Sequence, residues 1–308
     1  MKIVLTGASG LIGSRFFDLL KSKYEITALS SSYGVDITDR KKVESFLDGI
    51  NPAVIVHLAA KTNVDACEED KAQDERDLFA EKVLIDKKLD IGKIDSLFWK
   101  GSKTAFGINV VGTKNLADFA KLTGAKMIYV STDFVFDGEK DFYTEEDEVN
   151  PINWYGQTKL WGEEMIDNES LITRISFPFG FKSAIKNDLV WTLVNLLSTQ
   201  EKIKLVSDQS ITPTFIDDVI NGIDYLIENK KQGLINLTGN NNLSPEDIGR
   251  AIAREYGFDE GKIDQISRGE LYKGRAKRPF KLWLKNDKLK SLGFEMTDFF
   301  EALKRIKL

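Results

Sequence analysis

The chain has 308 residues, of which 42% are apolar, so it can bury a substantial core. Its net charge of −5 is spread along the sequence, which argues against nucleic acid as a partner. No apolar run approaches the roughly 20 residues that cross a bilayer, and the chain enters a strand pattern at once, so we expect a cytoplasmic protein without a signal peptide or membrane contact. One cysteine, Cys67, and one histidine, His57, exclude a disulfide framework, and we expect no metal site.

Short apolar runs alternate with helix-period segments through the first half of the chain. An apolar, β-branched run over 2–6 leads into a glycine-rich turn and then a helix that ends near Lys21. Further strands are predicted at 25–29, 53–58, 126–131 and 171–175. Further helices are predicted at 39–47, at 110–122 and from Trp154 onward. This alternation predicts an α/β fold built on a Rossmann-type doubly wound parallel sheet with right-handed crossovers.

Two segments depart from this alternation. Residues 68–102 are rich in Lys, Asp and Glu and have few apolar positions, so we expect an inserted, partly helical excursion. After Phe177 the strand-like pieces shorten between the helices predicted at 187–199, 216–228 and 245–256.

We therefore expect two functional parts. The dinucleotide-binding domain covers 1–175, with the excursion inserted, and also takes in 206–238. The smaller, discontinuous C-terminal α/β substrate lobe is made of 176–205 and 239–308.

Glycines at 7, 10 and 13 directly follow the first predicted strand. Gly7 can adopt a turn that a Cβ would forbid, Gly10 lets a pyrophosphate approach the main chain, and Gly13 permits close packing of helix on strand. The helix start at Leu11 and Ile12 then offers N–H donors and a positive dipole end to the phosphates. A glycine-rich turn without a ligand is the alternative, but the strand before it and the helix after it favour a dinucleotide site.

The end of the second strand bears on the choice between NAD and NADP. An NAD-specific site commonly has a carboxylate there, about twenty residues beyond the glycine loop, whereas this strand is followed by Ser30 and Ser31. Their hydroxyls can bond either a ribose 2′-hydroxyl or a 2′-phosphate, although no arginine is present to hold the phosphate. The pattern favours NADPH or the use of both cofactors. Asp36 and Ile37, slightly later, suit the amino group and the face of an adenine.

Tyr155 and Lys159 are four residues apart at the start of a predicted helix, so both side chains project from one face. A phenol with a pKa near ~10 is a poor acid at neutral pH, and a neighbouring ammonium lowers that pKa toward the working range. Thr132 follows a buried strand, at the edge where an open α/β sheet binds its ligands. The spacing alone is also compatible with an exposed tyrosine beside a solvated lysine.

Several motifs in chain order resemble the extended short-chain dehydrogenase/reductase superfamily. They are the glycine turn 7–13, Leu58-Ala59-Ala60, Asn109, Ser131-Thr132-Asp133 and Tyr155-Gly156-Gln157-Thr158-Lys159. Within that superfamily, three segments are similar to the dTDP-4-dehydrorhamnose reductase family, namely 131–138, 155–163 and 208–214. The resemblance covers most of the chain, and three motifs in order are more specific than any one of them.

The resemblance implies catalytic roles for residues at the matching positions. Thr132 would orient the substrate carbonyl, Tyr155 would donate the proton, and Lys159 would hold the nicotinamide ribose and lower the tyrosine pKa. Tyr155 and Lys159 thereby also count as cofactor-binding residues. Asn109 would support a water-linked proton relay, although a structural cap explains this residue equally well.

The resemblance also implies binding residues outside this set. Those that would border the cofactor are Ala59, Ala60 and Lys61, and those nearer the sugar are Thr62 and Val64. Phe134 and Phe177 would face the sugar ring, although a plain core role explains each equally well. In the family these two positions are commonly tyrosine and tryptophan, so the departures leave the identity of the hexose open.

The function implied by the resemblance is NAD(P)H-dependent reduction of the 4-keto group of a nucleoside-diphosphate 6-deoxyhexose. The leading substrate is dTDP-4-dehydrorhamnose and the product dTDP-L-rhamnose, within dTDP-rhamnose biosynthesis. One alternative is a nucleotide-sugar epimerase or dehydratase on the same scaffold. Another is a non-catalytic regulatory subunit resembling that of methionine adenosyltransferase. The expected partners are a nucleotide sugar and, in a homodimer, a second copy of the chain.

Overall fold

The computed structural model describes residues 1–85, 88–180 and 187–307, and its elements form two compact units. Unit 1 comprises Met1–Ser131 and Pro151–Ile172, and unit 2 comprises Thr132–Asn150 and Thr173–Leu308. The functional division expected from the sequence stays a prediction, because a compact unit is not by itself a binding domain. Parts of the predicted excursion and lobe, residues 86–87 and 181–186, lie outside the described residues. Among the helices of the described residues, none has the length and apolar character to span a bilayer.

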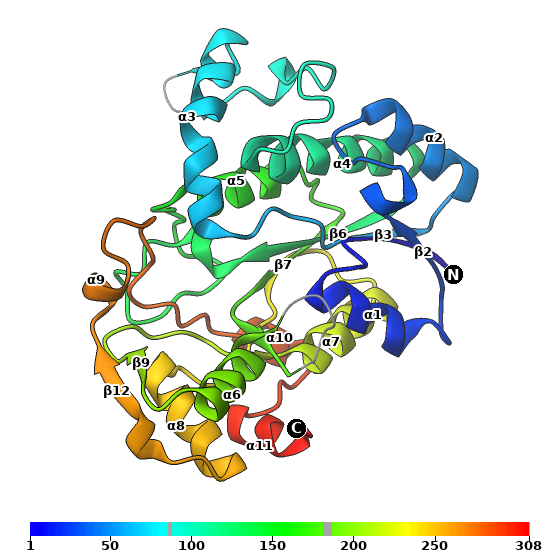
Figure 1. Cartoon of the computed structure of the whole chain (residues 1–308). Helices are drawn as coiled ribbons and strands as arrows, with labels where there is room; N and C mark the ends of the chain where they lie inside the picture. Colours follow the sequence, from blue (N-terminus) through cyan, green and yellow to red (C-terminus); the bar gives the residue numbers. More distant parts are fainter. Residues whose placement is uncertain (86–87, 181–186, 308) are drawn as a thin grey trace. The chain divides into compact units, whose positions relative to one another are not determined.

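A six-stranded sheet runs through the chain in the order β11-β7-β6-β3-β1-β2 (Figure 1). Its strands are β1 (Lys2–Thr6), β2 (Glu25–Leu29), β3 (Val54–His57), β6 (Lys126–Thr132), β7 (Leu171–Ile175) and β11 (Gly233–Asn236). β1 pairs in parallel with β2 on one side and with β3 on the other, and β3 pairs in parallel with β6. The chain therefore reverses its direction of winding at β1, and ligands of α/β sheets bind at such a switch point. The predicted Rossmann-type parallel sheet is confirmed.

In unit 1, helices cover both faces of this sheet. They are α1 (Leu11–Leu20), α2 (Arg40–Ile50), α3 (Val64–Ala80), α4 (Gly112–Thr123) and α5 (Trp154–Glu163). Figure 1 shows α1 on one face and α2 and α4 on the other. Leu47 of α2 and Phe119 of α4 pack with Ile55 of β3 in one buried cluster, which fixes both helices on the sheet.

Side-chain caps place helix starts that periodicity alone leaves approximate. Asp39 caps α2, so that helix begins at Arg40, one residue later than predicted. Asn63 caps α3, which therefore begins at Val64, before the start of the predicted excursion. After α3 come the antiparallel strands β4 (Leu84–Ile85) and β5 (Lys88–Leu89) and a 3₁₀ turn at Ile91–Lys93. The helix predicted at 110–122 begins earlier, with a π-helical turn at Gly107–Val111.

Unit 2 contains short strands between longer helices. Its elements besides β11 are β8 (Pro178–Phe179), α6 (Leu189–Thr199), β9 (Ile203–Val206), β10 (Thr214–Phe215), α7 (Ile216–Glu228), α8 (Pro245–Tyr256), β12 (Ile263–Ile266), α9 (Arg268–Leu271), α10 (Asp287–Ser291) and α11 (Phe299–Arg305). β8 pairs in parallel with β10, and β9 with β12. The helices predicted at 216–228 and 245–256 are confirmed residue for residue, and that at 187–199 starts at Leu189 because Asp188 caps it.

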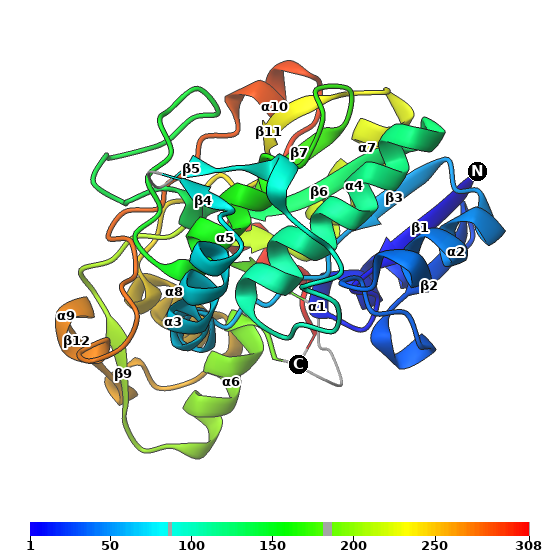
Figure 2. The same ribbon diagram turned by 90° about the horizontal axis from the view of Figure 1, so that it is seen from above.

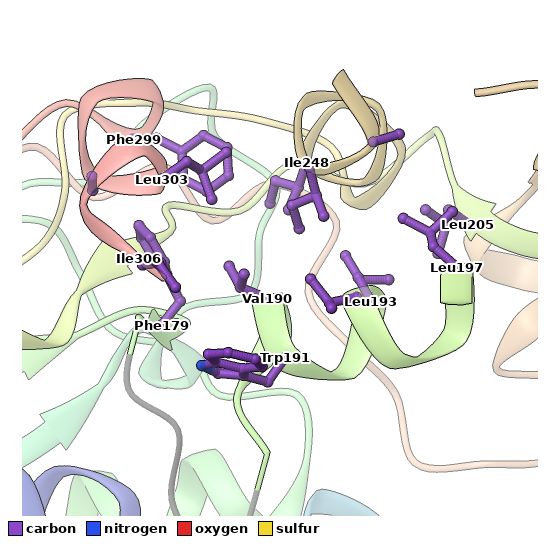
Figure 3. Close-up of a cluster of buried hydrophobic side chains, with 14 of the residues drawn as sticks. Phe179, Val190, Trp191, Leu193, Leu197, Leu205, Ile248, Phe299, Leu303 and Ile306 are labelled. Atoms are coloured by element: carbon purple, nitrogen blue, oxygen red, sulfur yellow. The ribbon is translucent and has the colours of Figure 1, made fainter. Parts of the chain in front are cut away.

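The core of unit 2 lies between α6, α8 and α11 (Figure 3). Val190 and Leu193 of α6 lie toward Ile248 of α8, and Phe299 and Leu303 of α11 close the cluster. Each of these side chains is almost completely buried, and burying one such side chain stabilises the fold by about 1.5–3 kcal/mol. This apolar core gives unit 2 a stable framework that does not depend on polar contacts.

Two helical glycines of unit 1 form a matched pair for a stability test. A methyl group on Gly13 of α1 would overlap the carbonyl oxygen of Gly7, whereas one on Gly49 of α2 would enter open space. We expect Gly13→Ala to lower the free energy of unfolding by about 1–3 kcal/mol through overpacking. We expect Gly49→Ala to raise it by about 0.5–1 kcal/mol, because alanine loses less backbone entropy. Urea denaturation measures both values, and equal effects of the two variants would contradict the close approach at Gly13.

Candidate active site

The glycine turn lies where β1 ends and is bounded by the backbone that follows β3. Gly7 has a φ of 69°, a conformation that residues with a Cβ rarely adopt. A Cβ at Gly7 would lie 2.7 Å from the backbone nitrogen of Ala59, so the turn rests directly on the neighbouring main chain. The N–H of Gly10 donates to the carbonyl oxygen of Gly7 over 2.8 Å, which closes the turn just before α1.

The start of α1 fits a dinucleotide pyrophosphate. Gly10, which precedes the helix, has no side chain that could cap the first turn or hinder an approaching phosphate. The first amides of an α-helix, here those of Leu11, Ile12 and Gly13, have no acceptor within the helix, and the helix dipole adds partial positive charge. The residues present therefore suit a bound phosphate group.

The residues after β2 offer hydroxyl groups. The Oγ atoms of Ser30 and Ser32 lie 2.6 Å apart, and Ser31 begins a short 3₁₀ turn. Asp36, four residues beyond Ser32, is already engaged: its carboxylate accepts hydrogen bonds from the backbone and hydroxyl of Thr38 and pairs with the ammonium of Lys103. Burial acts to raise the pKa of Asp36, but the hydrogen bonds from Lys103 and Thr38 outweigh it and leave the pKa below its usual value.

The side chain of Ile37 lies in the core instead of beside Asp36 on the surface. It is 8% exposed, and a Cβ at Gly112 of α4 would meet its Cδ1 at 2.6 Å. The side chain of Ile37 thus packs against α4, and its role beside an adenine stays a prediction.

His57, at the end of β3, is a buried hydrogen-bonding residue. Its Nδ1 lies 2.7 Å from the hydroxyl of Thr6, and its Nε2 lies 2.9 Å from that of Thr113. Burial, together with the nearby charge of Lys159, lowers the pKa of His57 to about 3. The ring stays neutral at physiological pH and ties β1, β3 and α4 together.

The loop between β3 and α3 carries the other residues expected near the cofactor and the sugar. They are the half-buried Ala59, Ala60, Lys61 and Val64 and the exposed Thr62. The hydroxyl of Thr6 accepts the N–H of Ala59 over 3.1 Å, and the ammonium of Lys61 pairs with Asp70. The loop is thus held from β1 at one end and from α3 at the other.

Asn109 lies in the π-helical turn Gly107–Val111, a feature that often marks functional positions. Its Oδ1 accepts the backbone N–H of Lys61 over 2.8 Å. Its amide donates to the carbonyl of Lys61 over 3.1 Å and to the hydroxyl of Thr158 over 3.0 Å. Through these bonds Asn109 holds the β3–α3 loop against α5. The water-linked proton relay stays a prediction.

Tyr155 and Lys159 lie one turn apart in the first half of α5. The helix begins after Asn153, whose side chain accepts the N–H of Gly156 over 2.8 Å. Tyr155 is 9% exposed and Lys159 3% exposed, so neither is the solvated surface residue of the alternative interpretation.

The ammonium of Lys159 is anchored to β6. It donates to the carbonyl oxygen of Val130 over 2.8 Å and lies 4.0 Å from the centre of the Tyr129 ring. Burial lowers the pKa of Lys159 to about 7, against the opposing charge of Glu163. A lysine in this position can exchange its proton near neutral pH, as acid–base chemistry requires.

In unit 2, Thr132 is hydrogen-bonded to a buried carboxyl group. Its hydroxyl donates to Oδ1 of Asp133 over 3.0 Å, and the hydroxyl of Ser176 donates to Oδ2 over 2.6 Å. Burial raises the pKa of Asp133 to about 7, although both hydroxyl bonds oppose the shift. No separate role was predicted for Asp133 and none for Ser176, because the contact between them spans 43 residues.

Phe134 and Phe177 lie near each other in unit 2, with ring centres 6.4 Å apart. Phe177 has a φ of 38°, which is rare for a bulky residue and often marks a functional position. It is half-buried at the edge of the unit 2 core, whereas Phe134 is 8% exposed. A role toward the sugar stays a prediction for both.

Unit 2 also has a basic segment, residues 268–281, for which no function was predicted. It contains six lysines and arginines and one acidic residue, and this composition is the signal that could have identified it. The guanidinium of Arg278 is 9% exposed and lies 4.8 Å from the centre of the Tyr272 ring. The N–H of Lys281 donates to the carbonyl of Gly138 over 3.0 Å, which joins the segment to the turn that follows Phe136.

The chain matches known proteins over nearly its whole length. The family model RmlD substrate binding domain matches residues 1–79 and 100–307, and the unmatched residues 80–99 lie inside the predicted excursion. A dTDP-4-dehydrorhamnose reductase of Aggregatibacter actinomycetemcomitans is 28% identical over 99% of this chain and 98% of that protein.

Solved structures agree with this match. A dTDP-4-dehydrorhamnose reductase ortholog from Clostridium acetobutylicum has a TM-score of 0.82 and 32% identity, over 99% of this chain and 98% of that one. The dTDP-4-dehydrorhamnose reductase of Bacillus anthracis in complex with NADP has a TM-score of 0.83 and 28% identity, over 99% and 98% of the two chains. The family resemblance is thereby confirmed, and this chain belongs to the RmlD substrate binding domain family of extended short-chain dehydrogenases/reductases.

Proposed function

We propose that this protein uses NAD(P)H to reduce the 4-keto group of a nucleoside-diphosphate 6-deoxyhexose, with dTDP-4-dehydrorhamnose as substrate and dTDP-L-rhamnose as product. The observation that carries the proposal is the buried pair Tyr155 and Lys159 on α5, whose lysine is anchored two residues before Thr132 on β6. The relatives named above as dTDP-4-dehydrorhamnose reductases support this choice of substrate.

Each catalytic residue has a distinct role in this proposal. When bound, the reduced nicotinamide supplies the hydride. Tyr155 donates the proton that converts the keto oxygen into a hydroxyl, Lys159 stabilises the resulting phenolate and holds the ribose, and Thr132 orients the carbonyl. Asn109 keeps the β3–α3 loop against α5 while this happens.

The proposed binding residues follow from the same assignment. Those for the cofactor are Gly7, Gly10, Leu11, Ile12, Gly13, Ser30, Ser31, Asp36, Ile37, Ala59, Ala60 and Lys61, together with Tyr155 and Lys159. Those for the sugar are Thr62, Val64, Thr132, Phe134 and Phe177. The basic segment 268–281 suits the diphosphate, since arginine pairs with phosphate oxygens. We further propose a cytoplasmic homodimer that prefers NADPH.

The two alternative functions, an epimerase or dehydratase and a regulatory subunit, predict different properties of the protein. An epimerase or dehydratase recycles its cofactor within each turnover and shows no net oxidation of NAD(P)H. A regulatory subunit gains nothing from a buried lysine whose pKa is about 7, because that burial lowers stability without serving binding. The buried lysine therefore favours an enzyme.

The first test is turnover with dTDP-4-dehydrorhamnose, followed by the absorbance of the reduced nicotinamide. We expect Tyr155→Phe to lower kcat by about 10²–10⁴-fold, because the proton donor is lost, while the variant still binds NADPH. Tyr225→Phe is the matched control, since the hydroxyl of Tyr225 donates to the carbonyl of Leu292 in unit 2. Wild-type protein that holds its cofactor but consumes none would contradict the proposal.

The stability of a Lys159→Met variant should depend on pH in a defined way. In the unfolded chain Lys159 has a pKa near 10.5, and in the folded protein about 7, so between these values only the unfolded chain binds the proton. The contribution of Lys159 to the free energy of unfolding of the wild-type protein therefore rises with pH between these two values. We expect Lys159→Met to be inactive yet more stable than wild type at pH 6, with the advantage shrinking toward pH 10. Urea denaturation at several pH values measures the free energy of unfolding of both proteins. A difference between them that does not change with pH would argue against the buried ammonium.

A carboxylate after β2 should change the cofactor preference. We expect Ser30→Asp to lower kcat/KM with NADPH by roughly tenfold or more, since like charges about 4 Å apart near a surface repel by ~1–4 kcal/mol. The value with NADH should stay the same or rise, because a carboxylate can bond the ribose 2′-hydroxyl. Steady-state kinetics with both cofactors measures the ratio, and an equal loss with both would place the 2′-phosphate elsewhere.

A further inference from the structure

The acidic residues of α3 have no part in the function proposed above, yet they contact the helices that carry its catalytic residues. Helix α3 runs beside α5 in both views (Figures 1 and 2). Glu68, Asp70 and Asp74 of α3 each accept hydrogen bonds from backbone amides at the start of another helix. Such amides lack partners within their own helix, so an external carboxylate satisfies them and stabilises the helix start.

The first of these helices leads to Asn109. Asp70 accepts the N–H of Ala105 over 2.7 Å, and Oδ2 of Asp74 accepts the N–H of Phe106 over 3.0 Å. Phe106 directly precedes the π-helical turn that contains Asn109. Asp74 thus bonds a residue, Phe106, that lies three positions before Asn109.

The second helix is α5, which carries Tyr155. Glu68 accepts the backbone N–H of Trp154, the first residue of that helix, over 2.8 Å. The indole N–H of Trp154 donates to Oδ2 of Asp74 over 2.8 Å, and its ring lies edge-on to Trp161 with centres 5.4 Å apart. Trp154 is therefore fixed through its backbone and its side chain immediately before Tyr155.

A single oxygen atom, Oδ2 of Asp74, therefore bonds the starts of both helices. Asp74 is completely buried, and burial raises its pKa although hydrogen bonds from Thr104, Trp154 and Phe106 oppose the shift. Burying a carboxyl group carries a free-energy penalty, which an apolar residue of similar size would avoid. Its presence here is explained by the placement that it gives to two helix starts.

We propose that Asp74 is a positioning residue, which holds Tyr155, through Trp154, and Asn109, through Phe106, in fixed relation to each other. The proposal rests on the reductase function proposed above. Acid–base groups must be held within about 0.5 Å of their productive geometry, and a misplacement of about 1 Å can lower the rate roughly 100-fold. Asp74 acts on the rate of the chemical step and leaves the binding of cofactor and sugar unchanged.

Kinetics of Asp74 variants test this role, with kcat expressed per site that binds NADPH so that misfolded protein does not count. We expect Asp74→Ala to lower kcat by roughly 10–100-fold with little change in KM. Asp74→Asn should retain more activity, because its carbonyl oxygen can take the place of Oδ2 and accept both hydrogen bonds. Asp77→Asn is the matched control, since Asp77 lies on the same helix and its carboxylate accepts hydrogen bonds from the side chain of Gln73. Wild-type kcat in Asp74→Ala, or equal loss in the Ala and Asn variants, would overturn the proposal.

Trp154, whose indole donates a hydrogen bond to Asp74, provides a second variant. Trp154→Phe removes the indole N–H but keeps an aromatic ring against Trp161. If both side chains act through one bond, the double variant Asp74→Ala/Trp154→Phe should lose little more than the more impaired single variant. Fully additive losses would overturn the shared role.

Hydrogen exchange supplies a readout that needs no substrate. We expect amide protection in the segments 105–110 and 154–159 to fall in Asp74→Ala and to stay at the wild-type level in Asp77→Asn. Unchanged protection in Asp74→Ala would overturn the positioning role. If wild-type protein reduces none of the sugars tested, the proposed function fails, whereas this exchange comparison still decides whether Asp74 fixes the two helix starts.

Discussion

The burial of one ammonium group, that of Lys159, constrains the rest of the candidate site. An ammonium can be buried only where an acceptor replaces water, and here the carbonyl of Val130 does so. This bond requires α5 to lie over β6 in one register, and that register in turn sets Tyr155 one turn earlier on the same face. His57 and Tyr129 pack around this point and stay neutral, while the pKa of Lys159 on α5 is about 7.

Much of the fold could be predicted from the sequence because its signals are local. A strand such as 171–175 or a helix such as 245–256 reveals itself by periodicity within its own residues, and Gly7 by the turn that it must make. Contacts between distant residues carry no such signal. Lys103 meets Asp36 across 67 residues, and Trp154 meets Asp74 across 80, so only the folded chain reveals these partners.

The candidate site shows the same division. Residue types and spacing were enough to predict that Tyr155 and Lys159 lie together, because a helix brings side chains four residues apart onto one face. The surroundings of a residue were not predictable. The structure buries Ile37 against Gly112 of α4, a contact that the neighbouring residues in the sequence do not reveal. Asp133 reads as part of a motif, yet burial raises its pKa to about 7 against the opposing effect of two hydroxyl bonds.

The residues that the family model does not match, 80–99, lie in the connection between the end of α3 and Ala105. The backbone N–H of Ala105 is bonded to Asp70. Both ends of this connection are therefore fixed by contacts that do not involve the connection itself. Closing a longer loop between fixed ends adds only about 0.6 kcal/mol for each doubling of its length. A change in the length of this stretch therefore carries only a small loop-closure cost, whereas loss of the buried Trp99, which packs on Phe106, would cost core contacts.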